Sequence, residues 1–205
     1  MTKKSPQNTA VSVRARLLNL AKERKEDFQH VLTRYANERL LYRLASSSHS
    51  DTFVLKGATL FAVWTGEPHR ATKDVDLLGF GEVSTQRIEA ILQDVIELHV
   101  QDDGLVFDGT SLQLGPIRED LAYGGIRAVL TTYLGNARIR LQVDVGFGDA
   151  ITPIAQETEV PSMLGFPAAR LRAYPRETVV AEKLEAMVQL GILNSRMKDF
   201  YDLMI

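Results

Sequence analysis

Two aspartates lie one residue apart in the apolar segment DVDLLG, residues 74–79. Side chains alternate between the two faces of a strand, so the carboxylates of Asp74 and Asp76 would leave the same face. Like charges held that close repel each other, and a bound metal cation is a common way to relieve the repulsion. The alternative is a solvated strand edge, which the apolar neighbours of the pair disfavour. The pair therefore predicts a Mg²⁺ site.

A third candidate metal ligand comes from the alternating segment RIRLQVDV, residues 138–145. Its apolar side chains can face the core, which leaves Asp144 on the polar face with Arg138 and Arg140. A sheet that presents three carboxylates on one face suits Mg²⁺, which prefers oxygen ligands. The alternative is an exposed aspartate that pairs with one of the two arginines. The residues leave both interpretations open.

One lysine has an unusual position on the helix predicted within residues 173–191. At 3.6 residues per turn, Lys183 falls between Val179 and Met187 inside an apolar arc. An ammonium group there must extend toward solvent or meet a negatively charged partner. A further interpretation is that Lys183 emerges beside a metal-bound triphosphate, where it would act as a point charge.

A glycine turn supplies the next candidate. The segment TFVLKGATLF, residues 52–61, predicts a short buried strand to Lys56, a turn at Gly57 and a helix from about Ala58. Without a side chain, Gly57 lets backbone N–H groups approach a phosphate, and the start of a helix favours negative charge. Thr59 could donate its hydroxyl. A glycine turn alone has little specificity, so this signal matters only together with the carboxylates.

Composition excludes several other chemistries. The chain of 205 residues has no cysteine, so disulfides, thiolate metal sites and cysteine nucleophiles are absent. Its four histidines lack ligand spacing, and neither a Walker motif nor a dinucleotide fingerprint occurs. The net charge of −2 means that contact with nucleic acid must rest on a local basic surface. Without a secretory signal or a membrane-spanning apolar run, we expect a soluble cytoplasmic protein with no membrane contact.

The order of the predicted elements indicates an α/β fold. Residues 1–10 resemble a flexible tail, and residues 11–205 are expected to form a single domain. Helices come first, a mixture of strands and helices follows, and helices end the chain. Two long strands are predicted around the turn at Gly135 and Asn136. The last helical pattern is still running at Ile205, so we expect a chain that is truncated at its carboxyl terminus.

Two segments together resemble a known family. FVLKGATLFAVWTGEPHRATKDVDLLG, residues 53–79, and VVAEKLEAMVQLGILNSRMKDFYDL, residues 179–203, are similar to the motifs of the AbiEii/AbiGii nucleotidyltransferase toxin family. The family has a core related to that of DNA polymerase β. The resemblance implies a nucleotidyltransferase-like mixed sheet with helices at both ends of the chain.

The resemblance also implies roles for individual residues. The implied metal pair is Asp74 and Asp76, the implied triphosphate contact is Lys183, the implied carboxylate from the last helix is Asp199, and the implied nucleotide loop contains Lys56, Gly57 and Thr59. For Asp199 the alternative is a surface ion pair with Arg196. The loop reads Gly-Ala-Thr where the family has Gly-Gly-Thr or Gly-Ser, which alters how closely phosphate can approach.

We therefore expect a Mg²⁺-dependent nucleotidyltransferase toxin of a toxin–antitoxin pair, which transfers NMP from an NTP to RNA, with the 3′ end of tRNA as first choice. The alternatives are NMP transfer to protein and a non-catalytic nucleotide-binding module of the same fold. The expected partners are an NTP, tRNA and a cognate antitoxin that binds DNA or the toxin directly.

Overall fold

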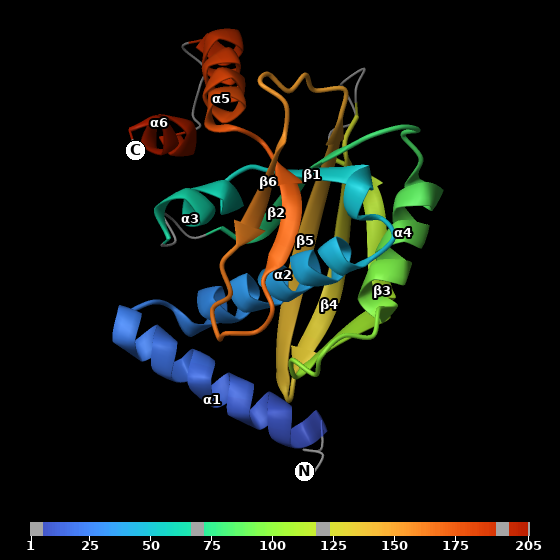
Figure 1. Ribbon diagram of the computed structural model, residues 1–205, viewed down its shortest axis with the longest axis vertical. Helices are drawn as coiled ribbons and strands as arrows, with labels where there is room; N and C mark the ends of the chain where they lie inside the picture. The colour runs from blue at the N-terminus through green and yellow to red at the C-terminus, as the bar shows by residue number, and fades with distance from the viewer. Residues whose placement is uncertain (1–5, 67–71, 118–123, 192–196, 205) are drawn as a thin grey trace.

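A seven-stranded mixed sheet forms the centre of the protein (Figure 1). The computed structural model describes residues 6–66, 72–117, 124–191 and 197–204. The strand order is β3-β4-β5-β2-β1-β7-β6. The strands are β1 (Phe53–Lys56), β2 (Asp74–Gly79), β3 (Leu105–Pro116), β4 (Ile126–Leu134), β5 (Ala137–Phe147), β6 (Gln156–Val160) and β7 (Ala169–Ala173). This architecture confirms the predicted α/β class with a mixed sheet.

The pairing of the strands places β2 in the middle of the sheet. It runs parallel to β5 on one side and antiparallel to β1 on the other. β1 also pairs in parallel with β7, and the remaining neighbours are antiparallel. The predicted hairpin is present: β4 and β5 pair from Leu134 and Ala137 outward, and Gly135 takes the positive φ that its tight turn requires.

Helices pack against the sheet and beyond one end of it. They are α1 (Pro6–Arg24), α2 (Phe28–Ser46), α3 (Thr59–Thr65), α4 (Thr85–Glu97), α5 (Arg176–Leu190) and α6 (Met197–Leu203). In Figure 1, α2 crosses the sheet, α4 lies beside it, and α1 runs along the lower edge. Two helices have side-chain caps at their amino ends, because the side chains of Asp27 and Ser84 accept hydrogen bonds from the first turns of α2 and α4. None of the described helices combines the length and apolar character needed to cross a membrane.

The tail predicted for residues 1–10 is wrong in its second half. Helix α1 begins at Pro6, so residues 6–10 are helical, and residues 1–5 lie outside the described part of the chain. The buried side chain of Ala10 belongs to the core with Val13 and Leu17, which explains why the helix extends this far. The sequence pattern underestimated the helix because polar residues occupy its first turns.

Alternation along β5 separates a covered face from a polar face. Ile139, Leu141, Val143 and Val145 are fully buried, as predicted from their spacing. The residues between them are exposed or only partly buried. The strand therefore presents its apolar side to the helices and its polar side to the other face of the sheet.

A buried ionic cluster holds α2 against the loop that precedes β3. The carboxylate of Asp103 accepts hydrogen bonds from Arg39 Nε at 3.0 Å and from Arg43 Nη1 at 2.6 Å. It also accepts one from the backbone N–H of Leu105. Arg39 donates further to the carbonyl of Pro167 at 2.8 Å, just before β7. Both arginines and Asp103 are buried, so these contacts depend on one another.

We predict that Asp103→Asn destabilises the fold by about 3–5 kcal/mol, because it removes the negative charge that two buried guanidinium groups share. The matched control is Asp94→Asn, since Asp94 is exposed and pairs with His49 on the surface. That change should cost less than about 1 kcal/mol. Urea denaturation of the three proteins measures both values, and equal losses for the two variants would contradict the prediction.

Candidate active site

The strand register brings the three predicted carboxylates to one face of the sheet. Asp76 lies opposite Lys56 of β1 on one side and opposite Asp144 of β5 on the other. Asp74 lies two residues before Asp76 and opposite Gln142. Residues that align on neighbouring strands point to the same side, so Asp74, Asp76 and Asp144 share the polar face. The structure thus brings together the residues that the alternation suggested.

Burial, together with mutual repulsion, makes the ionised forms of Asp74 and Asp76 costly. Burial raises the pKa of Asp76 to about 6, helped by repulsion from Asp144 and Asp74 and opposed by Lys56 and Lys198. Burial also raises the pKa of Asp74, and repulsion from Asp144 is the second largest cause. Negative charge is therefore concentrated here beyond what the neighbouring lysines neutralise.

Asp144 has a partner that the sequence did not suggest. Arg127 of β4 donates from Nε to Oδ1 at 2.8 Å and from Nη2 to Oδ2 at 2.7 Å. The two residues lie directly opposite each other, whereas Arg140 lies opposite Thr131. The ion pair expected with Arg138 or Arg140 is therefore replaced by one with Arg127. Across the described residues, no three acidic or histidine side chains converge closely enough to hold a metal ion.

Gly57 touches the central carboxylate. A Cβ added at Gly57 would lie 2.1 Å from Oδ2 of Asp76, and the φ of Gly57 is +74°. Only glycine allows this approach together with this backbone conformation. Helix α3 follows directly but contains only seven residues, so its dipole adds little to the site. The contact between Gly57 and Asp76 is the firmer observation.

A cavity of about 430 Å³ adjoins this contact. One wall comes from the end of β1, the following turn and β2, and the opposite wall comes from α5 and α6. Its charged lining residues are Lys56, Asp76, Asp149, Glu182, Lys183, Glu185, Lys198 and Asp199. Three lysines and several carboxylates thus surround one space next to Asp76.

Lys183 meets negatively charged partners rather than solvent. Its Nζ donates to Oδ1 of Asp199 at 3.0 Å and to Oδ2 of Asp202 at 2.7 Å. Both aspartates are buried, so Asp199 is not the surface residue of the alternative interpretation, and Arg196 lies outside the described residues. Much of the apolar arc predicted on α5 is exposed, because α5 packs on α6 through this ionic contact rather than on the main core.

Lys56 is also held by carboxylates. Its Nζ donates to Asp149 at 2.5 Å and to Glu182 at 3.1 Å. Burial lowers the pKa of Lys56, but attraction to Glu182 and Asp149 outweighs it and leaves that pKa raised. Sequence reasoning assigned no role to Asp149, Glu182 or Lys198. Glu182 and Lys198 could have been found, since each directly precedes a motif residue, whereas Asp149 has no such signal.

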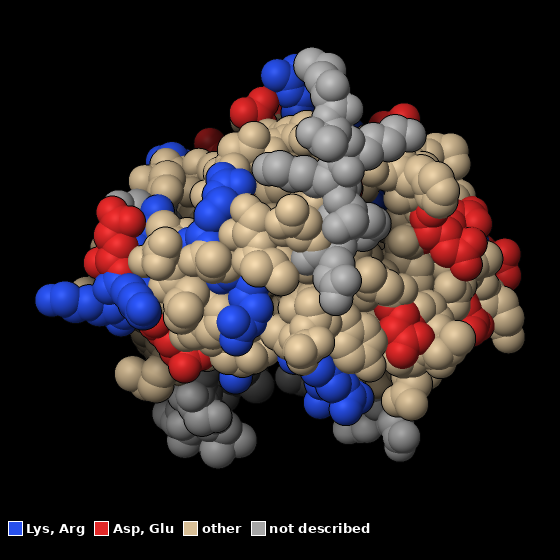
Figure 2. All heavy atoms as spheres, turned by 90° about the horizontal axis from the view of Figure 1, so that it is seen from below, with Lys and Arg blue, Asp and Glu red and all other residues tan. Residues whose placement is uncertain are grey.

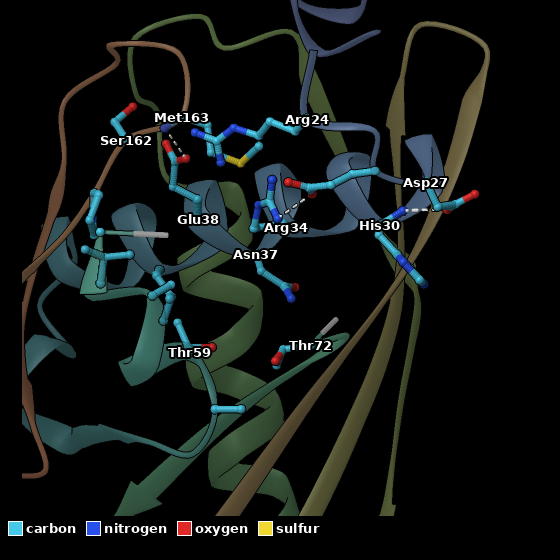
Figure 3. Close-up of a pocket in the computed structure, with 17 residues that line it drawn as sticks. Arg24, Asp27, His30, Arg34, Asn37, Glu38, Thr59, Thr72, Ser162 and Met163 are labelled. Atoms are coloured by element: carbon cyan, nitrogen blue, oxygen red, sulfur yellow. Dashed lines mark hydrogen bonds and ion pairs between the residues drawn. The ribbon is translucent and has the colours of Figure 1, made fainter. Parts of the chain in front are cut away.

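Thr59 lies apart from this cavity. It lines a second cavity of about 400 Å³, together with Asn37 and Glu38 of α2 (Figure 3). Ala58 lines both spaces, so the turn after β1 forms the partition between them. The resemblance grouped Thr59 with Gly57, but the first turn of α3 directs the two residues to different cavities.

A comparison with known protein families gives a match over most of the chain. The family described as nucleotidyl transferase AbiEii toxin, type IV toxin–antitoxin system, matches residues 39–205. The chain belongs to this family. The AbiEii match covers both segments that carried the resemblance, and it confirms that resemblance.

Two solved structures have a fold similar to that of this chain. JHP933 from Helicobacter pylori has a TM-score of 0.56 and 14% identity, over 86% of this chain and 65% of its own. A second H. pylori structure, described as that of a "putative nucleotidyltransferase", has a TM-score of 0.55 and 15% identity, over 86% of this chain and 67% of its own. The chain spans about two thirds of the length of these proteins, and at these identities the likeness shows the fold alone. A comparison with curated protein sequences finds no match.

Gly57→Ala should damage the site more than its matched control, Gly66→Ala. Both glycines have a φ near +75°, but a Cβ at Gly66 meets no atom within 4 Å. Each variant should lose about 1–2 kcal/mol of stability from the left-handed backbone. Only Gly57→Ala should also displace Asp76 and weaken binding of NTP with Mg²⁺. Urea denaturation and calorimetry separate the two effects, and equal NTP affinity in both variants would refute the proposed contact.

The raised pKa of Asp76 predicts a pH dependence of stability in metal-free protein. In the folded state Asp76 keeps its proton up to about pH 6, whereas in the unfolded state it loses it near its ordinary value of 3.8. The folded state therefore binds more protons between these values, and its stability falls as pH rises through the window. Relative to wild type, Asp76→Asn should gain stability between pH 4 and pH 7. Denaturation in EDTA measures this gain, and a constant difference across the range would contradict it.

Proposed function

We propose that this protein catalyses Mg²⁺-dependent transfer of NMP from an NTP to an RNA hydroxyl, with the 3′ end of tRNA as acceptor. The observation that supports this most is the carboxylate face of Asp74, Asp76 and Asp144 beside a cavity that contains three lysines. Membership of the AbiEii family supports the same reaction class. The triphosphate would enter the cavity, where Lys56, Lys183 and Lys198 line the walls.

The carboxylates fit a divalent cation. The raised pKa values of Asp74 and Asp76 mark a cluster whose repulsion a cation would relieve, and carboxylate oxygens are the ligands Mg²⁺ prefers. Asp74 and Asp76 would hold the ion, and Asp144 would join them if its carboxylate turned from Arg127. Bound there, Mg²⁺ would orient the phosphates and neutralise part of their charge.

Residues of the chain itself would bind the phosphates and stabilise the charge that develops during the transfer. The acceptor hydroxyl oxygen forms a bond to the α-phosphorus, and the bond from that phosphorus to the leaving pyrophosphate breaks. Lysines offset the charge that grows on the pyrophosphate, a role suited to Lys183 and Lys198 at the cavity wall. Gly57 leaves backbone N–H groups accessible to phosphate oxygens. Positioning and charge stabilisation would supply most of the rate.

RNA as acceptor draws support from the distribution of basic residues. The net charge of −2 offers no general attraction to RNA, so a local surface is required. Figure 2 shows the molecule from below, on the face along which α1 runs. Lys and Arg side chains spread over its left and central parts, with a few acidic side chains among them, while Asp and Glu dominate the right edge. The last turn of α1 contributes Lys22 and Arg24. Such a surface suits the phosphate backbone of RNA.

One observation favours a second candidate, a non-catalytic nucleotide-binding module. Lys183 is already paired with Asp199 and Asp202, and Asp144 with Arg127. In a module these pairs would remain in place, whereas catalysis requires at least some of them to exchange partners. In either case, family membership supports an antitoxin as partner, which binds DNA or the toxin itself.

The transfer assay uses labelled NTP, Mg²⁺ and total tRNA. Wild-type protein should label RNA, and Asp76→Ala should reduce the rate by at least about two orders of magnitude, because it removes a charge that positions the reacting groups. The surface variant Asp94→Asn should retain the wild-type rate. Label in protein instead of RNA would identify a protein acceptor. NTP binding without transfer to either would establish the module.

A further inference from the structure

The second cavity is a site that the proposed reaction does not use. It lies between α2, α3 and the loop that joins β6 to β7 (Figure 3). Its volume of about 400 Å³ falls within the range of small-molecule sites. The apolar part of its lining includes Leu41, Ala62 and Met163. Such a space can take a flat ring system.

Buried polar atoms of this cavity lack hydrogen-bond partners within the described part of the chain. Asn37 donates through Nδ2 to the carbonyl of Lys73, but its Oδ1 accepts no hydrogen bond there. Glu38 accepts at Oε2 from the backbone N–H of Met163, while its Oε1 accepts no hydrogen bond there and lies 3.7 Å from Nη1 of Arg39, its ion-pair partner. Only 7% of Asn37 and 4% of Glu38 are exposed. An unpaired buried acceptor costs about 1–3 kcal/mol, so Oδ1 of Asn37 indicates a ligand that supplies a donor.

The rim of the cavity carries two arginines beside the acidic Glu26 and Asp27. Arg24 is exposed at the mouth, and the partly buried Arg34 lies further in. Arg34 uses Nη1 in an ion pair with Glu26 at 2.8 Å, and its Nη2 has no acceptor among the described residues. His30 also lines this side. The ligand should therefore carry donors on its inner edge and negative charge on its outer end.

We propose that this cavity binds a nucleotide, with the base against Asn37 and Glu38 and the phosphate at Arg24 and Arg34. Carboxamide and carboxylate side chains recognise the amino groups of adenine and cytosine, which matches the free acceptor of Asn37 and the neighbouring carboxylate of Glu38. Arginine binds phosphate through paired N–H groups, which matches the rim. The nucleotide would lie across the turn at Ala58 from the carboxylates of the active site.

Two sources share this chemistry, a free mononucleotide and an unpaired nucleotide of an RNA chain. The choice of RNA rests on the proposed function, since an acceptor whose terminal hydroxyl reaches Asp76 could place a neighbouring nucleotide in the adjoining cavity. The position of Arg24, in the last turn of α1, at the rim agrees with a chain that continues along that face.

Calorimetry with AMP, CMP, GMP, UMP and inorganic phosphate, without Mg²⁺, tests the cavity. At least one mononucleotide should bind, and Ala62→Leu, which fills the space from α3, should weaken it at least about tenfold. Arg34→Gln should also weaken it, whereas Arg170→Gln should not, because Arg170 forms an exposed pair with Glu159 away from the cavity. If Ala62→Leu fails to fold, Arg24→Gln with Arg34→Gln provides the test. No mononucleotide binding, equal binding of phosphate alone, or unchanged affinity in the folded cavity variants would overturn the proposal.

A second arm identifies the source and separates this proposal from the catalytic one. Anisotropy of a labelled single-stranded oligoribonucleotide should show the same sensitivity to Ala62→Leu if RNA is the ligand. If Ala62→Leu weakens the binding of mononucleotides but not of the oligoribonucleotide, the ligand of the cavity is a free nucleotide. Asp76→Asn should leave the mononucleotide affinity unchanged, since Asp76 lines the other cavity. If the protein shows these sensitivities to Ala62→Leu and Asp76→Asn but has no transferase activity, the nucleotide site in the second cavity is supported and the proposed transfer reaction is rejected.

Discussion

The position of β2 in the sheet determines the electrostatics of the whole site. Because β2 pairs with β1 on one side and β5 on the other, Asp76 must lie between Lys56 and Asp144. Backbone hydrogen bonds fix this register, and the carboxylates cannot separate without breaking the ladder. The neighbouring features respond to this constraint. Arg127 neutralises Asp144, and Gly57 gives Asp76 the room it occupies. The apolar side of the same strands anchors the arrangement to the core.

Two lysines of the site already form ion pairs with carboxylates of the protein. Lys56 contacts two carboxylates, and Lys183 contacts two others. Triphosphate binding would therefore replace existing partners, and its net gain is the difference between two sets of charge-assisted contacts. Such exchange favours selectivity, because a ligand with fewer negative charges cannot recover what the lysines lose. It also links α6 to occupancy of the cavity, since Asp199 and Asp202 belong to that helix.

The parts of the fold that were predictable rest on local patterns. Alternation around Asp76 and Asp144 indicated their strands, and Gly57 marked the turn between β1 and α3. The partner of Asp144 was not predictable, because Arg127 reaches it only through the register of β4 against β5. Strands β6 and β7 were missed because they are five residues long and follow a segment rich in proline. The separation of Thr59 from Gly57 depends on how one turn of helix is oriented, which spacing does not encode.

The parallel pairing of β1 with β7 has a consequence for synthesis of the protein on the ribosome. Leu55 of β1 aligns with Ala173 of β7, and its carbonyl accepts a hydrogen bond from the N–H of Tyr174 at 2.9 Å. One edge of β1 therefore stays uncovered until more than a hundred further residues have emerged. Contacts so distant in sequence form slowly, and an open strand edge can pair with other chains meanwhile. In nascent AbiEii chains of this kind, a chaperone or an early-binding partner would therefore be most useful during this interval, because it would shield the open edge of β1.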